Sequence, residues 1–197
     1  MAAAAHSARR EETRKRIIDA FWRLHANQPV SQLKVQSIAS AAGCSRTTFY
    51  QYFDSIYDLE DQAEEEFVED AATFIEARVG TLRDHGSYAL AELTTDTIES
   101  FGDRLRALSL YSDGPSITMR LVDAARPALA STLELDAEDP TDAFVADTLI
   151  GYTMATVTSW YRHDQPIPIR ELSEGVNAMF TEWILPRVRN RGQPVEE

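Results

Sequence analysis

The sequence predicts an all-α protein with about nine helices, because apolar residues recur at helical spacing in its long segments. Sustained alternation of apolar and polar residues, which marks a half-buried strand, does not occur, and Asn-Gly hairpin turns are absent as well. Glycine and proline separate the helical segments. With 197 residues, the chain is long enough for one sizeable core or two small ones.

The first helix is expected over residues 9–26, after a flexible arm of residues 1–8. Ile17, Phe21 and Leu24 recur on one face of this segment, which stops before an asparagine and a proline. We therefore expect the helix to pack under the two short segments that follow it.

Residues 35–53 have the pattern of a helix-turn-helix. Gly43 stands where the chain must turn sharply, and glycine enters a positive φ angle without steric cost. Ser45 is a favourable N-cap for the second helix. The apolar face of the pair consists of Val35, Ile38, Ala39, Ala42, Phe49, Tyr52 and Phe53. This pattern favours a DNA-reading module, although an ordinary helical hairpin can also place a glycine between two amphipathic segments.

A long helix is expected from Ser55 to Gly80, because Ser55 and Asp58 resemble a capping box. Asp139 followed by Pro140 is a favourable start for a later helix. The remaining helical segments are residues 87–99, a short stretch after a weak point at Gly102, and residues 117–133, 140–162 and 169–188. The predicted organisation is thus a helix-turn-helix domain of residues 9–54, a helical body of residues 55–190 and a tail of residues 191–197.

Charge is distributed unevenly along the chain, although the net charge is −13. Residues 1–53 carry eight Lys/Arg and three acidic residues, a net charge of +5. Residues 54–197 carry eleven Lys/Arg and 29 acidic residues, a net charge of −18. Phosphates attract the first part and repel the second, so the distribution favours double-stranded DNA as a partner of the N-terminal segment.

Several classes of protein are disfavoured. No run approaches the roughly 18 apolar residues of a membrane span, and the N-terminus lacks the apolar core of a signal peptide, so we expect a cytoplasmic protein without a membrane partner. A single cysteine, Cys44, excludes an internal disulfide and a cysteine-based zinc site. The four histidines lack metal-ligand spacing and no catalytic motif occurs, so we expect no enzyme activity, metal or cofactor.

The exposed face of the second motif helix is expected to read DNA. With Phe49 inward and about 100° per residue, Thr47 and Gln51 point away from the core. Gln51 suits adenine and the Thr47 methyl suits a thymine methyl, whereas flanking and N-terminal side chains suit phosphates. The complete set of predicted DNA contacts is Arg9, Arg10, Arg14, Lys34, Arg46, Thr47, Thr48, Tyr50 and Gln51.

The two C-terminal helices are more apolar than a solvent-facing pair, which favours a homodimer joined by a four-helix bundle. The alternative is that these helices close the core of their own subunit. Small residues every four positions in the penultimate helix would let a second helix approach closely. The expected interface consists of Gly151, Ala155, Ser159, Val176, Phe180 and Trp183.

The motif KVQSIASAAGCSRTTFYQYFDSIYDL, residues 34–59, resembles the tetracycline-repressor (TetR) family of transcriptional regulators. The resemblance is specific over about residues 9–60 and weaker beyond them, where TSWYRHDQPIPIRELSE resembles the family's last inter-helix loop. It implies a repressor that binds a palindromic operator as a homodimer and is released by a small-molecule effector bound in the body. The expected effector pocket consists of Phe74, Tyr88, Phe101, Tyr111, Met119, Met154, Trp160 and Tyr161.

The sequence also departs from the family pattern. Asp54 and Ile56 stand where many members carry lysines, which removes two expected phosphate contacts and shifts that role to the N-terminal basic residues and Arg46. This departure leaves open a second function, in which a helical dimer has lost DNA binding and acts through protein partners.

Overall fold

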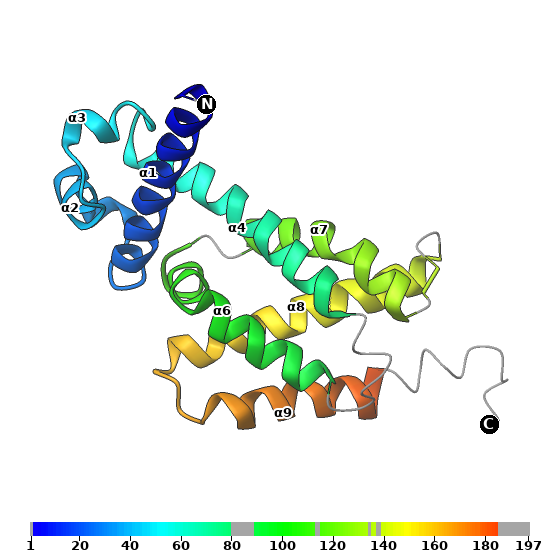
Figure 1. The fold of residues 1–197 in the computed structure, drawn as a ribbon. Coiled ribbons are helices and arrows are strands. Elements are labelled where there is room, and N and C mark those ends of the chain that lie inside the picture. Colours follow the sequence, from blue (N-terminus) through cyan, green and yellow to red (C-terminus); the bar gives the residue numbers. More distant parts are fainter. Residues whose placement is uncertain (1, 80–88, 113–114, 134, 137–138, 185–197) are drawn as a thin grey trace, which may run out of the picture. The chain divides into compact units, whose positions relative to one another are not determined.

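The computed structural model describes residues 2–79, 89–112, 115–133, 135–136 and 139–184 (Figure 1). These residues form eight α-helices and no strand, which confirms the all-α prediction and is close to the expected count of nine. A short 3₁₀ turn, η1, and a π-helical turn, η3, complete the described elements. In chain order they are α1 (Ala2–His25), η1 (Val30–Gln32), α2 (Val35–Ala41), α3 (Arg46–Phe49), α4 (Ile56–Val79), α6 (Ala89–Tyr111), α7 (Pro115–Leu133), α8 (Pro140–Arg162), α9 (Ile169–Met179) and η3 (Phe180–Ile184).

The described residues divide into two compact units. The head comprises those of Met1–Phe67 and Asp103–Ser112, and the body comprises those of Val68–Gly102 and Asp113–Glu197. The head therefore extends past the predicted boundary at residue 54. It does so because the first turns of α4 bury apolar side chains in its core. The predicted tail of residues 191–197 lies outside the described residues.

The N-terminal residues expected to form an arm are helical from Ala2 onward, since α1 begins there and continues without interruption to His25. Alanine has the highest intrinsic helix propensity, and residues 2–5 are four consecutive alanines. No glycine or proline separates them from the amphipathic segment at residue 9. The helix therefore extends back through the part of the chain that lacks an apolar face.

The head core joins α1, α2, α3 and the beginning of α4. Seven of its large apolar side chains are no more than 1% exposed, and each such burial contributes on the order of 1.5–3 kcal/mol to folding. This packing holds α3, which at four residues is far too short to be a stable helix in isolation. These core side chains are Ile17, Phe21, Ile38, Phe49, Phe53, Leu59 and Phe67.

The turn between α2 and α3 has the geometry that its sequence predicts. Gly43 adopts a φ of +66°, in the left-handed region where a side chain would be strained. The Ser45 side chain accepts a hydrogen bond from the backbone N–H of Thr48 at 3.0 Å, and it thereby caps α3. The glycine sets the direction in which α3 leaves the turn, and the serine cap fixes its first residue.

The body is built from α7, α8, α9 and the described body parts of α4 and α6. Its core cluster joins Leu93, Val122, Leu149 and Val176 with neighbouring apolar side chains. Asp139 accepts hydrogen bonds from two backbone N–H groups at the start of α8, as its sequence predicts. No described helix is long and apolar enough to cross a membrane.

The predicted weak point in α6 is visible in its backbone. Phe101, which precedes Gly102, has a non-helical φ of −120° and ψ of 17°, so two helical segments meet there at a kink. The division between the two units falls one residue later, between Gly102 and Asp103. Residues on either side of the kink consequently belong to different units.

His25 is a buried titratable group in the head, with 1% of its surface exposed. Its Nδ1 lies 3.0 Å from the carbonyl oxygen of Gln28, which can only accept, so Nδ1 carries the hydrogen. Its Nε2 is 4.0 Å from a carboxylate oxygen of Glu60, and its ring packs against those of Phe21 and Tyr111. Burial lowers the pKa of His25, and the hydrogen bond to Gln28 opposes part of this effect.

We expect the head to lose stability as the pH falls through about 6.5. The unfolded histidine binds a proton near its ordinary pKa, whereas the buried ring resists protonation until a lower pH, so the free energy of unfolding falls by at most about 1.4 kcal/mol per pH unit. Urea midpoints at pH 7.5 and 5.5, followed by circular dichroism, measure this loss. The His25→Asn variant should reduce the pH dependence, whereas the exposed control His163→Asn should keep it. Equal pH dependence in wild type and His25→Asn would contradict the assignment.

Candidate DNA-binding surface

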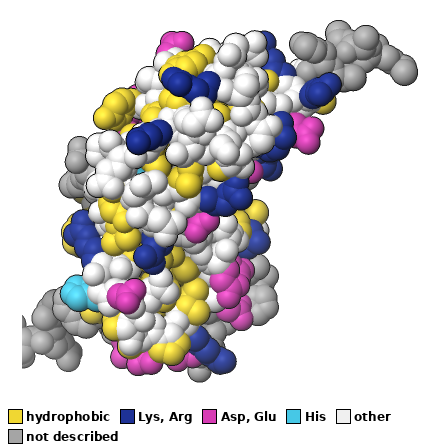
Figure 2. All heavy atoms as spheres, turned by 90° about the vertical axis from the view of Figure 1, so that its left-hand side faces the viewer, with side chains coloured by type: hydrophobic (Ala, Val, Ile, Leu, Met, Phe, Trp, Pro, Cys, Tyr) yellow, Lys and Arg dark blue, Asp and Glu magenta, His cyan; other side chains and the backbone are white. Residues whose placement is uncertain are grey.

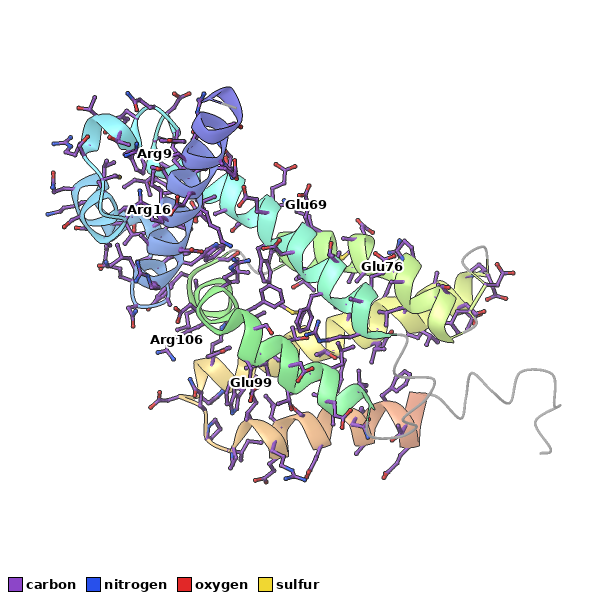
Figure 3. All side chains as sticks on the ribbon, viewed as in Figure 1. Arg9, Arg16, Glu69, Glu76, Glu99 and Arg106 are labelled. Carbon is purple, nitrogen blue, oxygen red and sulfur yellow. The ribbon has the colours of Figure 1, made fainter. Side chains whose placement is uncertain are left out.

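A wide groove runs along α1, the Gly43 turn and α3, all within the head. Its volume is about 890 Å³, and its lining is more polar than apolar. Figure 3 labels Arg9 and Arg16, which lie on the side of α1 that faces α2 and α3. The groove is lined by Arg9, Arg10, Thr13, Arg16, Gly43, Cys44, Ser45, Thr48, Gln51 and Tyr52.

The orientation of α3 agrees with the helical reading of its sequence. Phe49 is fully buried, while Thr47 and Gln51 are exposed, as are Arg46 and Tyr50. The α-helix ends at Phe49, and the next residues continue as a turn in which Gln51 N donates to Thr48 O at 3.1 Å. The exposed side chains therefore stand on a surface whose backbone is fixed by the buried phenylalanine.

Thr48 is half-buried, and its Oγ1 lies 2.9 Å from Ser45 Oγ. Its hydroxyl thus belongs to the cap of α3 as well as to the groove. Arg10, at the groove, places its guanidinium 5.7 Å from the ring centroid of Tyr52. Tyr52 was expected in the core, but it is half-exposed and lines the groove.

Arg14 has a different role from the phosphate contact predicted for it. Its guanidinium pairs with Glu66 and donates to Gln62 Oε1 at 3.0 Å, both on α4. It also lies over the Phe53 ring, 5.7 Å from the centroid. These contacts join α1 to α4 and engage the guanidinium, which argues against the predicted phosphate contact. Position 14 lies on the α4 side of α1, and the sequence does not reveal which partner it meets there.

The predicted contact Lys34 is exposed just before α2, and it is not among the residues that line the groove. At the start of α4, Ser55 Oγ accepts from Asp58 N at 3.0 Å, and Asp58 accepts from Asp54 N at 2.8 Å. Ser55 therefore caps α4 as expected, but the reciprocal bond to Asp58 comes from the backbone N–H of Asp54 and not from that of Ser55. The side chain of Asp54 is left exposed.

Sequence reasoning missed Thr13, Arg16 and Ser45 as residues of the groove. The signal that could have found the first two is their spacing, because Arg9, Thr13 and Arg16 stand at i, i+4 and i+7 on one face of α1. Cys44 also lines the groove and is only partly buried. Desolvation raises the pKa of its thiol, while the positive charge of Arg16 opposes that shift.

The residues predicted for the effector pocket do not form one group. Phe74 and Phe101 meet with ring centroids 5.2 Å apart, and Met154 packs partly buried against the body core. Trp160 donates from Nε1 to Ile167 O at 2.8 Å, and the Tyr161 hydroxyl donates to Gly102 O at 3.2 Å, so both fix helices.

Two other predicted pocket residues lie apart from the body core. Tyr111 belongs to the head, where its ring lies 5.7 Å from that of His25, and Met119 is 54% exposed on α7. Helical periodicity shows that each lies on an amphipathic helix but does not show which unit, or which side, receives it. Tyr88 lies outside the described residues.

The predicted dimer interface is also divided. Val176 and Phe180 are 0% and 5% exposed within the body core, which contradicts their assignment to an interface. The apolar face of α9 instead closes its own subunit. Ala155 and Ser159 are exposed, and a Cβ at Gly151 would meet no atom within 4 Å. The side chain of Trp183 lies outside the described part of the chain.

Within the described residues, no group of three or more His, Cys, Asp or Glu side chains could hold a metal ion. The polar chemistry that the groove offers is that of guanidinium, hydroxyl and amide groups. These groups bind phosphates and base edges.

Two short helices joined at a left-handed glycine, with the second helix exposed and held by a buried phenylalanine, define a helix-turn-helix domain. The family model of bacterial regulatory proteins of the tetR family matches residues 17–63, which cover α2, α3 and their supports in α1 and α4. This match covers the helix-turn-helix part of the chain and supports a regulator of the TetR family.

Curated relatives match the same part of the chain. Two uncharacterized HTH-type transcriptional regulators of Mycobacterium tuberculosis, from strains CDC 1551 and H37Rv, are each 50% identical over 50 residues. Each match spans 25% of this chain and 25% of the relative. The curated relatives therefore resemble this chain only over a quarter of its length. The likeness of the body rests on the solved structures.

Solved structures share the fold over most of the chain. A tetR-family transcriptional regulator from Streptomyces coelicolor has a TM-score of 0.70 at 23% identity, covering 91% of this chain and 85% of that one. The fatty acid degradation regulator FadR from Bacillus halodurans has a TM-score of 0.68 at 16% identity, covering 87% and 96%. The TetR family repressor AlkX from a Dietzia strain has a TM-score of 0.61 at 20% identity, covering 88% and 97%.

We expect Gln51→Ala to change the base preference of the protein. A bidentate amide contact to adenine contributes about 1–3 kcal/mol of discrimination, so the loss should fall on selected sequences and spare random DNA. Selection of bound duplexes from a random library measures this preference for wild type and variant. Gln32→Ala, at an exposed position outside the groove, is the matched control. An equal loss on selected and random DNA would contradict a reading role for Gln51.

We expect Arg14→Ala to destabilise the head and to leave the salt dependence of DNA binding unchanged. The variant removes the bridge to Glu66 and Gln62, and because the pair is partly exposed the cost should be about 1 kcal/mol. Urea denaturation measures the stability, and fluorescence anisotropy at several salt concentrations measures the binding. If Arg14→Ala keeps the wild-type stability but lowers the slope of log affinity against log salt, Arg14 contacts a phosphate and the expectation is wrong.

Proposed function

We propose that this chain is a cytoplasmic transcriptional regulator that binds a palindromic operator as a homodimer, represses by occluding a promoter, and leaves the DNA when a small-molecule effector binds the body. The observation that carries the proposal is the groove of the head. Three arginines of α1 line it together with the polar residues Thr48 and Gln51.

The charge of the chain supports DNA as the partner of the head. The N-terminal 53 residues have a net charge of +5, whereas the whole chain has −13. Figure 2 shows Lys and Arg side chains on the face that carries α2 and α3. Attraction of phosphates to the head, and their repulsion from acidic surfaces elsewhere, favours binding through α3.

The exposed face of α8 supports a homodimer. Ala155 and Ser159 are exposed, and a Cβ added at Gly151 would meet no atom within 4 Å. Phe144 on the same helix is 66% exposed. Small residues let a second helix approach closely, and the exposed phenylalanine adds apolar area to the contact. Pairing of two heads matches the two half-sites of a palindromic operator, whose centres lie about 34–36 Å apart.

The body supplies apolar and aromatic side chains for an effector. Phe74, Tyr152 and Met154 are partly buried against the body core, and Phe74 also contacts Phe101. An effector releases DNA only if it binds the DNA-incompetent state more tightly. The described lining favours an effector with an apolar part. Two proteins of similar fold are a regulator of fatty acid degradation and a repressor implicated in n-alkane biodegradation, which accords with such an effector.

We expect Ala155→Glu to prevent dimerisation and to weaken operator binding together. A carboxylate on each copy would place two like charges in the close contact of α8 with its partner. Sedimentation should show wild type at about twice the chain mass of 22.1 kDa and the variant near 22.1 kDa. The matched control is Ala124→Glu, at an exposed alanine of α7.

Gel shifts at low and moderate salt, with DNA from upstream of the gene that encodes this chain, test whether the protein binds an operator. A monomeric wild type would contradict the homodimer. A dimer that shifts no DNA at either salt concentration would instead favour a regulator that acts through protein partners.

A further inference from the structure

The groove of the head contains a third arginine besides Arg9 and Arg10. Arg16 is exposed, and it lines the groove beside the Gly43 turn. Its Nη1 would be 3.8 Å from a Cβ at Gly43, so the guanidinium lies directly against the turn that leads into α3. Thr13 and Arg9 lie on the same face of α1, one and two turns before Arg16, respectively.

A short hydrogen-bond chain positions this guanidinium. Thr13 Oγ1 donates to the backbone carbonyl of Arg9 at 3.0 Å, and Arg16 Nη2 donates to the same Thr13 oxygen at 3.3 Å. Within the described part of the chain, this is the one hydrogen bond that Arg16 makes. An arginine carries five N–H donors, so most of the donors of Arg16 are available to a ligand.

The other arginines of α1 that point elsewhere are engaged by the protein. Arg14 pairs with Glu66 and Gln62, and Arg23 donates to the backbone carbonyls of Asp19 and Ala41. In contrast, the ten residues that line the groove include three arginines and no carboxylate. The positive charge of the groove is therefore not neutralised by its own lining, and an anion would complete it.

We infer that this groove holds a backbone phosphate of DNA, and that Arg16 is its principal cation, positioned by Thr13. The inference rests on the proposed DNA-binding function and assigns part of its affinity. DNA is the occupant because Thr48 and Gln51 of the reading surface line the same groove, so a strand read by α3 passes along it. The contact also supplies anchoring that the acidic and apolar residues at positions 54 and 56 do not provide.

Fluorescence anisotropy with a random-sequence duplex and with a duplex selected from a library tests the inference. The variants are Arg16→Gln, which removes the charge, and Arg16→Lys, which keeps it. The matched control is Arg170→Gln, which removes an exposed charge from the body helix α9. Each lost phosphate contact should reduce the magnitude of the slope of log affinity against log salt by about 0.9. Between 50 and 200 mM salt, the loss of affinity in such a variant should therefore be about 3.5-fold smaller than in the wild type.

We expect Arg16→Gln to lower the slope equally on both duplexes, with its preferred base sequence and its thermal midpoint unchanged. Arg16→Lys and Arg170→Gln should keep the wild-type slope. A wild-type slope in Arg16→Gln, alongside normal DNA binding by the wild type, would overturn the role of Arg16 alone. A changed base preference would overturn the phosphate contact in favour of base reading. Absence of DNA binding by the wild type would overturn the proposed function itself.

Discussion

The burial of Phe49 in the head core is the interaction on which the reading surface depends. The helix that carries this residue is four residues long, and a helix of that length does not persist in water without tertiary contacts. Ser45 caps its beginning and Phe49 holds its end, so Thr47 and Gln51 are exposed in fixed directions. The directions of the two side chains proposed to read bases are therefore set by an apolar contact inside the head.

The head obtains its core from segments that are distant in the sequence. Leu59 and Phe67 come from α4, and the end of α6 also belongs to this unit. There Arg106 donates from Nε to the carbonyl oxygen of Ala26 at 3.1 Å, just beyond the last residue of α1. Helix α6 continues from the body into the head through the kink at Phe101. The part of α6 that contacts the end of α1 is therefore continuous with a helix of the body.

Neighbouring arginines of α1 have separate roles because a helix turns by about 100° per residue. Arg14 faces α4, where a carboxylate and an amide engage it, whereas Arg16 faces the groove, where no carboxylate is present. The net charge of the N-terminal segment therefore overstates the charge that DNA meets. Electrostatic anchoring depends on which of these guanidinium groups the protein has already paired.

Sequence alone determined the features that depend on neighbouring residues. These are the positive φ at Gly43, the caps at Ser45, Ser55 and Asp139, the all-α fold and the outward direction of Gln51, since each follows from local sterics or helical periodicity. Tertiary structure decided which partner each face meets. Periodicity shows that one face of a helix is buried, but the buried face of α9 fits a partner subunit and its own core equally well. Long-range packing resolved that choice, because it buried Val176 and Phe180 within the subunit.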